Sequence, residues 1–451
     1  MIEERKVLGA EAAAASADDG EIERLYSEYV NTSFVKGIEP VVVERALGAA
    51  VHAADGAEYV DLFAGISVVS VGHCHPAVVA AAKEQMEKLI HAASYLYYVP
   101  VVGRLAEKLA AITPGRLRKT FFGNSGAEAV EGAMRLAKAH TGKSEFIALQ
   151  TGFHGRTNAT LAVTGNAARK THGGPYVSGA AFAPAPNPYR CRYCTGSCTL
   201  ACADAVEDVF RYQTSGDVAA FIAEPVLGEG GIIVPHPDYF RRVREIVDRH
   251  DALFITDEVQ TGFCRTGAMF AIEQYGVEPD IMALAKGIAD GFPLGAFIAT
   301  PEIADSFQPG EHLSTFGGAP VSCAAALAVI GVLEEDRLAE RSAELGAWAQ
   351  GELKERTERL PIVGDVRGLG LMIGVELVLD RETKTPAPAA AAEVRRRCRE
   401  EGVLVGVGGQ DANVVRIQPP LVIEREQLQR ALDVLCHVLG SVSTPGVSAA
   451  R

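Results

Sequence analysis

The sequence lacks any apolar run of the roughly 20 residues that a membrane-spanning helix needs. Its N-terminus has mixed charges and no apolar stretch, so we do not expect a secretory signal. The chain is also short of cations: 57 Asp and Glu residues outnumber 43 Lys and Arg residues, and the formal net charge is −14. An acidic chain offers no basic face to nucleic acid. We therefore expect a cytoplasmic protein that binds neither a membrane nor a nucleic acid.

Aromatic residues are scarce as well, at 7% with one Trp, whereas hydrophobic residues make up 48% of the 451 residues. A chain of this length and composition can bury one large core and a smaller one. From residue 119 onward, short apolar runs alternate with glycine turns and helical patterns. This alternation predicts an α/β fold in which helices cover a mainly parallel central sheet.

The organisation along the chain predicts two tails and two domains. We expect disordered tails at 1–21 and 441–451, and a large domain over 65–318. Segments 22–64 and 319–440 are predicted to build a smaller α+β domain from both ends of the chain. Segment 165–203 is rich in Gly, Pro and Cys, which predicts an irregular loop insertion, and loops of that length are usually functional.

Two apolar runs end in residues that can carry chemistry. The run ALFIT, residues 252–256, is directly followed by Asp257, and the run over 280–285 leads to Lys286. If both are parallel strands, their carboxyl ends meet at one edge of the sheet, where α/β proteins bind ligands. An amine and a carboxylate in one crevice are what pyridoxal 5′-phosphate (PLP) requires. The simpler alternative is a helix-capping aspartate and a solvated lysine.

A glycine-rich turn, GNSGAEA at 123–129, lies between a predicted strand and a predicted helix. Glycines let the backbone curl, and a helix N-terminus presents unpaired N–H groups to an anion. The turn lacks the spacing of a P-loop and of a dinucleotide fold. It therefore predicts a phosphate cradle at Ser125, Gly126 and Ala127.

Other polar residues follow or interrupt predicted strands. In the turn GFHGR, Phe153 could stack on a flat cofactor and Arg156 could pair with a substrate carboxylate, with core packing and a surface ion pair as alternatives. Glu224 and Glu229 could steer substrate or restrain an arginine, or they could cap a helix. Arg416 interrupts an apolar strand and calls for an anionic partner.

Seven short motifs together resemble one family. SGAEA, FHGR, EPVLGEGG, DEVQTGFCRTG, AKG, STFGG and RIQPP occur in the order and at the intervals found in class III (ornithine/4-aminobutyrate-type) PLP-dependent aminotransferases. The resemblance covers roughly 30–440. It implies the PLP-dependent transferase fold type I and a homodimer, or a higher oligomer, with active sites at the subunit interface. It also implies ping-pong transfer of an amino group from an ornithine-, 4-aminobutyrate- or alanine-like amino acid to a 2-oxo acid.

The resemblance implies roles for the matched residues. Lys286 is similar to the lysine that forms the Schiff base, and Asp257 to the partner of the pyridine nitrogen. Arg416 resembles the arginine that binds an α-carboxylate, Glu229 the glutamate that masks it, and Arg156 the second carboxylate binder. The other cofactor-binding candidates are Ser125, Gly126, Ala127, Phe153, His154, Glu224, Val259, Gln260 and Thr315, the last of which is contributed by the neighbouring subunit.

Four of the nine cysteines crowd into one loop, as Cys191-x2-Cys194-x3-Cys198-x3-Cys202. Four thiolates at such spacing could bind an iron–sulfur cluster, which we favour, or zinc. A subgroup of 4-aminobutyrate-type aminotransferases is similar here, with a CxxC that joins subunits through an iron–sulfur cluster. The alternative is four reduced, partly buried thiols.

Two other interpretations compete with transamination. Some relatives with similar segments are amino-acid racemases, and others decarboxylate dialkyl amino acids with the same cofactor. A non-enzymatic sensor of the same fold is the third hypothesis. The joint presence of Lys286, Asp257 and Arg416 argues against it.

Overall fold

A computed structural model describes residues 19–31, 38–171, 173–194 and 196–442 of the chain. The predicted tails at 1–21 and 441–451 lie outside the described residues except for 19–21 and 441–442. Residues 19–21 belong to helix α1 (Asp19–Tyr29). No helix in the described ranges is long and apolar enough to cross a membrane.

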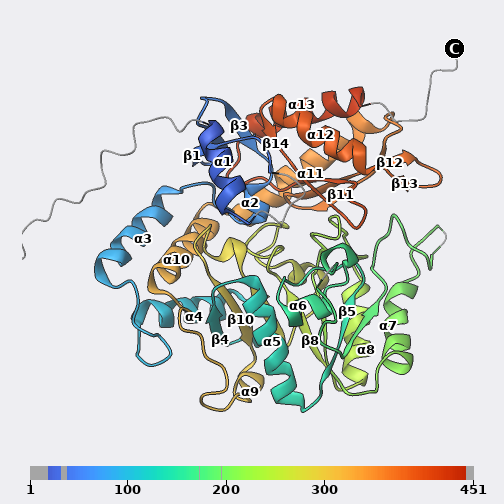
Figure 1. Cartoon of the computed structure of the whole chain (residues 1–451). Helices are drawn as coiled ribbons and strands as arrows, with labels where there is room; N and C mark the ends of the chain where they lie inside the picture. The colour runs from blue at the N-terminus through green and yellow to red at the C-terminus, as the bar shows by residue number, and fades with distance from the viewer. Residues whose placement is uncertain (1–18, 32–37, 172, 195, 443–451) are drawn as a thin grey trace, which may run out of the picture.

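A seven-stranded sheet forms the centre of the lower half of Figure 1. Its strand order is β4-β10-β9-β8-β7-β5-β6, and β10 alone runs antiparallel to its neighbours β4 and β9. The prediction of a mainly parallel sheet is therefore confirmed. The strands are β4 (Lys119–Gly123), β5 (Glu145–Leu149), β6 (Ala180–Ala183), β7 (Val218–Ala223), β8 (Leu253–Asp257), β9 (Ile281–Leu284) and β10 (Gly295–Ala299).

Alternate residues of each strand belong to two separate cores, because successive side chains point to opposite faces of a sheet. In β7, Phe221 and Ala223 join one core and Ala220 and Ile222 join the other. Helix α5 (Gly126–Thr141) packs into the second core, and α7 (Ala201–Tyr212) and α8 (Tyr239–Arg249) pack into the first. The other helices before residue 310 are α2 (Ala64–Ser67), α3 (Pro76–Lys88), α4 (Pro100–Ile112), α6 (Asn158–Val163) and α9 (Pro301–Ala304).

Segments from near the two ends of the chain lie together in the upper part of Figure 1. Strands β1 (Val43–Leu47), β2 (Ala50–Ala53) and β3 (Glu58–Asp61) form a sheet in which β14 (Val403–Leu404) pairs parallel with β3. A second sheet has the order β11-β12-β16-β15, with β13 on β12. The strands of this second sheet are β11 (Val363–Leu369), β12 (Met372–Asp380), β13 (Thr385–Pro386), β15 (Gly406–Gly408) and β16 (Val414–Ile417). The helices after residue 310 are α10 (Pro320–Glu335), α11 (Leu338–Thr357), α12 (Pro388–Glu400) and α13 (Arg425–Ser441).

One segment differs from its predicted structure. The segment 165–203 is not wholly irregular: it contains the 3-10 turn η1 (Ala167–Arg169), strand β6 and the first turn of α7. Strand β6 forms because the run AAFA pairs in parallel with β5. Strands β11 and β12 form a hairpin in which Gly370 turns the chain at φ 53°, a left-handed conformation that glycine adopts without strain. The domain boundaries at 64/65 and 318/319 stay predictions.

Candidate functional site

Asp257 and Lys286 lie at the carboxyl edge of the large sheet. Strands β8 and β9 are parallel neighbours, with Asp257 opposite Ala283. Asp257 ends β8, and Lys286 opens the 3-10 turn η3 (Lys286–Ile288) just after β9. Burial lowers the pKa of the Lys286 amine, although the charges of Asp257 and Glu224 oppose that shift. The edge therefore presents a buried carboxylate and an amine that gives up its proton more readily than an exposed lysine.

His154 fixes the carboxylate of Asp257. Its Nδ1 lies 2.7 Å from Asp257 Oδ2, and the Val259 N–H donates to Asp257 Oδ1 at 3.0 Å. Both side chains are buried. Burial disfavours the charged imidazole, but the hydrogen bond and the charge of Asp257 outweigh it and raise the pKa of His154. Among the described residues, His154 Nε2 has no hydrogen-bond partner.

Glu224 joins two loops at the same edge. Its oxygens accept hydrogen bonds from the Phe153 N–H and the Gly228 N–H, each at 2.9 Å. Burial raises the pKa of Glu224 to about 7. In the described ranges, the Glu224 side chain makes no ion pair with an arginine. The suggestion from the sequence that Glu224 restrains an arginine therefore does not match this geometry.

The glycine-rich turn begins helix α5 beside this carboxylate. Ser125 is the N-cap, and its Oγ accepts from the Glu128 N–H at 3.2 Å. A Cβ added to Gly126 would lie 2.8 Å from Val259 Cγ1, so the start of α5 packs directly against the segment after Asp257, whereas Ala127 lies beside Gly155. Gln260 is buried there, and its Oε1 has no partner among the described residues. A phosphate suits the N–H groups at the start of α5, and a bound cofactor would give Gln260 Oε1 a polar partner, so these residues fit PLP.

A cluster of three charges lies beside the same loops. Arg416 Nη1 donates to Glu229 Oε2 at 2.9 Å, and Arg169 donates to the other oxygen of Glu229. Burial would raise the pKa of Glu229, but the two guanidinium groups outweigh it and hold that pKa low. Sequence reasoning missed Arg169, because the irregular segment around it gives no periodic or motif signal.

Two predicted residues lie outside these contacts. Arg156 is exposed, and no described hydrogen bond or ion pair links it to Glu229 or Arg416. Thr315 is exposed on the segment after α9, although its neighbour Ser314 lies 3.4 Å from Asn124 at the start of the cradle.

The structure does not support the metal prediction for the cysteine loop. Among the described residues, no group of three or more His, Cys, Asp or Glu side chains is arranged to hold a metal ion. Cys202 is buried in the core at the first turn of α7, which raises the pKa of its thiol to about 12. Cys194 Sγ accepts a hydrogen bond from the Thr199 N–H at 3.4 Å, and Cys198 is exposed. One of the four thiols is thus committed to packing, and iron–sulfur and zinc are both without support.

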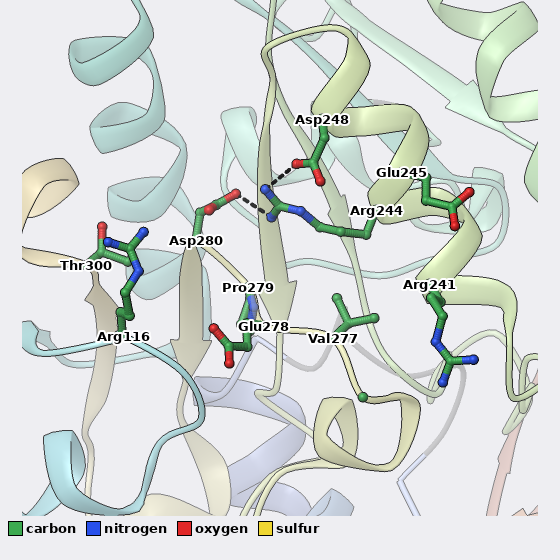
Figure 2. A pocket seen from close by; sticks show the side chains of 11 residues that line it. Arg116, Arg241, Arg244, Glu245, Asp248, Val277, Glu278, Pro279, Asp280 and Thr300 are labelled. Atoms are coloured by element: carbon green, nitrogen blue, oxygen red, sulfur yellow. Dashed lines mark hydrogen bonds and ion pairs between the residues drawn. The ribbon is translucent and has the colours of Figure 1, made fainter.

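A charged cavity of about 360 Å³ lies at the opposite edge of the sheet (Figure 2). Asp280 lines it just before β9 begins, whereas Lys286 follows the end of that strand. Arg244 points at two carboxylates there, and pairs with Asp280 at 2.7 Å and with Asp248. Because this arginine is already neutralised, the cavity is a weaker candidate than the carboxyl edge.

Comparison with known proteins agrees with this geometry. The family model described as aminotransferase class-III matches residues 34–439. An acetylornithine aminotransferase of Methanothermobacter thermautotrophicus is 43% identical over 425 residues, which is 94% of this chain and 100% of that protein. The crystal structure of a Bacillus anthracis aminotransferase has a TM-score of 0.89 and 34% identity, and the match covers 94% of this chain and 98% of that one. A leucine/methionine racemase of Thermococcus litoralis is 40% identical over 406 residues, 89% of this chain and 91% of that protein.

Proposed function

This chain belongs to the class III aminotransferase family and is a PLP-dependent aminotransferase, and we propose that it moves an amino group from an ornithine-, 4-aminobutyrate- or alanine-like amino acid to a 2-oxo acid in two half-reactions. The observation that carries the proposal is that Asp257 ends β8 and Lys286 follows the adjacent parallel strand β9, with Asp257 held by His154.

Asp257 and Lys286, at the carboxyl edge of the sheet, would have different roles in the reaction. PLP, when bound, supplies an electron sink for the negative charge that develops at the substrate carbon. Asp257, oriented by His154, would keep a proton on the pyridine nitrogen. Lys286 would hold the cofactor aldehyde and, as a neutral amine, would move the proton away from the substrate carbon; its lowered pKa supports this role.

The remaining candidates would bind the rest of the cofactor. Ser125, Gly126 and Ala127 would hold the phosphate at the N-terminus of α5, where backbone N–H groups and the helix dipole favour an anion. Phe153 and Val259 would cover the two faces of the ring, and Gln260 would lie near its phenolic oxygen. For the substrate, we propose Arg416 as the α-carboxylate site, Glu229 as its mask and Arg156 as a second carboxylate binder.

We propose a homodimer in which Thr315 reaches the neighbouring subunit's phosphate. The support is an apolar surface on two segments, where large hydrophobic side chains stay exposed in the single chain. Ser94 Oγ donates to Gly317 O at 2.7 Å, so these segments lie together. Surfaces of this kind usually mark contacts between proteins. The exposed residues are Met86, Ile90, Tyr95, Leu96, Tyr97, Tyr98, Leu313 and Phe316.

A donor panel tests the proposed reaction. Purified holoenzyme is incubated with 4-aminobutyrate, β-alanine, ornithine, N-acetylornithine, lysine or alanine, with and without 2-oxoglutarate or pyruvate. We expect product beyond one equivalent of enzyme only when an acceptor is present. The alternative reaction, racemisation, gains weight from the racemase relative. It predicts loss of optical purity of a single enantiomer without any acceptor, and that outcome would replace our proposal.

A further inference from the structure

Glu229 is held between two arginines that come from different parts of the fold. Arg416 lies on β16, and Arg169 lies on η1 in the segment before β6. The side chains of Arg416 and Glu229 are 4% and 14% exposed, whereas that of Arg169 is 45% exposed. Since each oxygen of the carboxylate has its own guanidinium, one partner can leave while the other stays.

The backbone beneath Arg169 is anchored to the site. The N–H groups of Gly165 and Asn166 both donate to Gly152 O, at 2.9 and 3.2 Å, and the Asn166 side chain accepts from the Ala168 N–H at 3.1 Å. A Cβ on Gly165 would lie 2.2 Å from Leu149 O, so the close approach requires glycine there. Arg169 is therefore positioned by the same loop that carries Phe153.

The three side chains together carry one net positive charge. A substrate carboxylate that binds Arg416 would neutralise the cluster, but it must first displace Glu229 from Nη1. A mostly buried carboxylate left without a partner is strongly unfavourable. The contact with Arg169 removes that penalty, because Glu229 keeps one guanidinium after it has lost the other.

We propose that Arg169 is a specificity-determining residue that retains Glu229 while a substrate α-carboxylate binds Arg416. When Glu229 is paired with both Arg169 and Arg416, the site accepts amines whose reacting carbon bears no carboxylate. When Glu229 is paired with Arg169 alone, Arg416 is free to bind a carboxylate, and the site accepts 2-oxo acids and α-amino acids. This inference rests on the proposed function and adds to it the residue that holds Glu229 when Arg416 is released.

The experiment compares the two half-reactions in Arg169→Gln, Arg169→Lys and wild-type holoenzyme. We expect Arg169→Gln to raise the KM for 2-oxoglutarate about tenfold, equivalent to ~1.4 kcal/mol, with kcat little changed. The half-reaction with 4-aminobutyrate should stay within about twofold, and Arg169→Lys should recover most of the loss. The control is Arg192→Gln, an exposed arginine of the same segment. Calorimetry with glutarate, an unreactive dicarboxylate, should show the same weakening without catalysis.

Two results would overturn the inference. Equal losses in both half-reactions would mean that Arg169 only supports the local structure. An undiminished effect of Arg169→Gln in a Glu229→Gln background would mean that Arg169 binds the substrate directly. If the wild type converts no donor at all, the proposed function fails instead, while the glutarate affinities still test Arg169.

Discussion

Replacing Glu258 with Gln tests how burial sets the charge of carboxyl groups beside the site. Glu258 directly follows β8 and is fully buried. Its Oε1 accepts from the Ile272 N–H at 2.8 Å, and its Oε2 accepts from the Thr261 hydroxyl. Burial raises the pKa of Glu258 from 4.5 to about 7, because the charged form loses its hydration.

The raised pKa means that the folded protein holds the Glu258 proton more tightly than the unfolded chain does, and this sets the direction in which stability changes with pH. Well below pH 4.5 the group is protonated in both the folded and the unfolded state. As the pH rises toward 7, the unfolded chain loses the proton first, so the free energy of unfolding falls, and above pH 7 the loss is complete. The gap between 4.5 and about 7 corresponds to about 3.4 kcal/mol, of which roughly 2.5 kcal/mol falls between pH 5 and pH 8. Gln cannot ionise and lacks this dependence.

Urea unfolding at about pH 5 and pH 8 measures the effect. We expect the difference in unfolding free energy between Glu258→Gln and the wild type to shift by about 2.5 kcal/mol in favour of the variant at the higher pH. Any constant difference, such as an altered hydrogen bond to Thr261, cancels in this comparison. A difference that stays the same at both pH values would refute the reasoning.

Glu224→Gln is the matched contrast. Glu224 is equally buried and its pKa is also raised to about 7, but each of its oxygens accepts a backbone N–H. A glutamine turns an NH₂ group toward one of these donors. We therefore expect this variant to lose about 1–3 kcal/mol at pH 5, and to recover part of that loss at pH 8 as the wild-type carboxylate becomes charged.

Three further predictions concern the site itself. Lys286→Ala should retain no covalently held PLP, and borohydride reduction followed by peptide mapping should label residue 286 in the wild type alone; labelling elsewhere contradicts the assignment. His154→Phe removes the 2.7 Å partner of Asp257 and should lower kcat/KM about 10- to 100-fold while circular dichroism shows an intact fold, with His154→Gln recovering part of the rate. Gly295→Ala places a Cβ 2.2 Å from Ser125 O and should weaken PLP binding at least about tenfold, whereas Gly331→Ala, where a Cβ meets no atom within 4 Å, should bind PLP normally.

The elements with a strong local pattern were predictable from the sequence. The alternation of apolar runs and helical patterns indicated the parallel sheet, and the positions of Asp257 and Lys286 after two such runs indicated a shared edge. Parallel pairing of β8 and β9 then brings them together, since register follows from the buried faces of both strands.

What the sequence could not reveal depends on long-range packing. The hydrogen bond between His154 and Asp257 joins the loop after β5 to the end of β8, and Arg169 reaches Glu229 from an irregular segment. β10 runs antiparallel to β4 and β9, although its apolar composition resembles that of the parallel strands of the sheet. The crowding of four cysteines suggested a metal site, but local spacing says nothing about which thiol the core will bury, and Cys202 is buried.

The pairing of β3 with β14 has a consequence for biosynthesis. A ribosome releases all seven strands of the large sheet well before it reaches residue 403, so that sheet can fold while the chain is still being made. Strands β1, β2 and β3 are synthesised first, but β3 can pair with β14 only after residues 403–404 have been made. Arg416 arrives later still, on β16. A nascent polypeptide can therefore build the proposed cofactor-binding edge early, but it acquires the arginine proposed to bind a substrate carboxylate only when translation is almost finished.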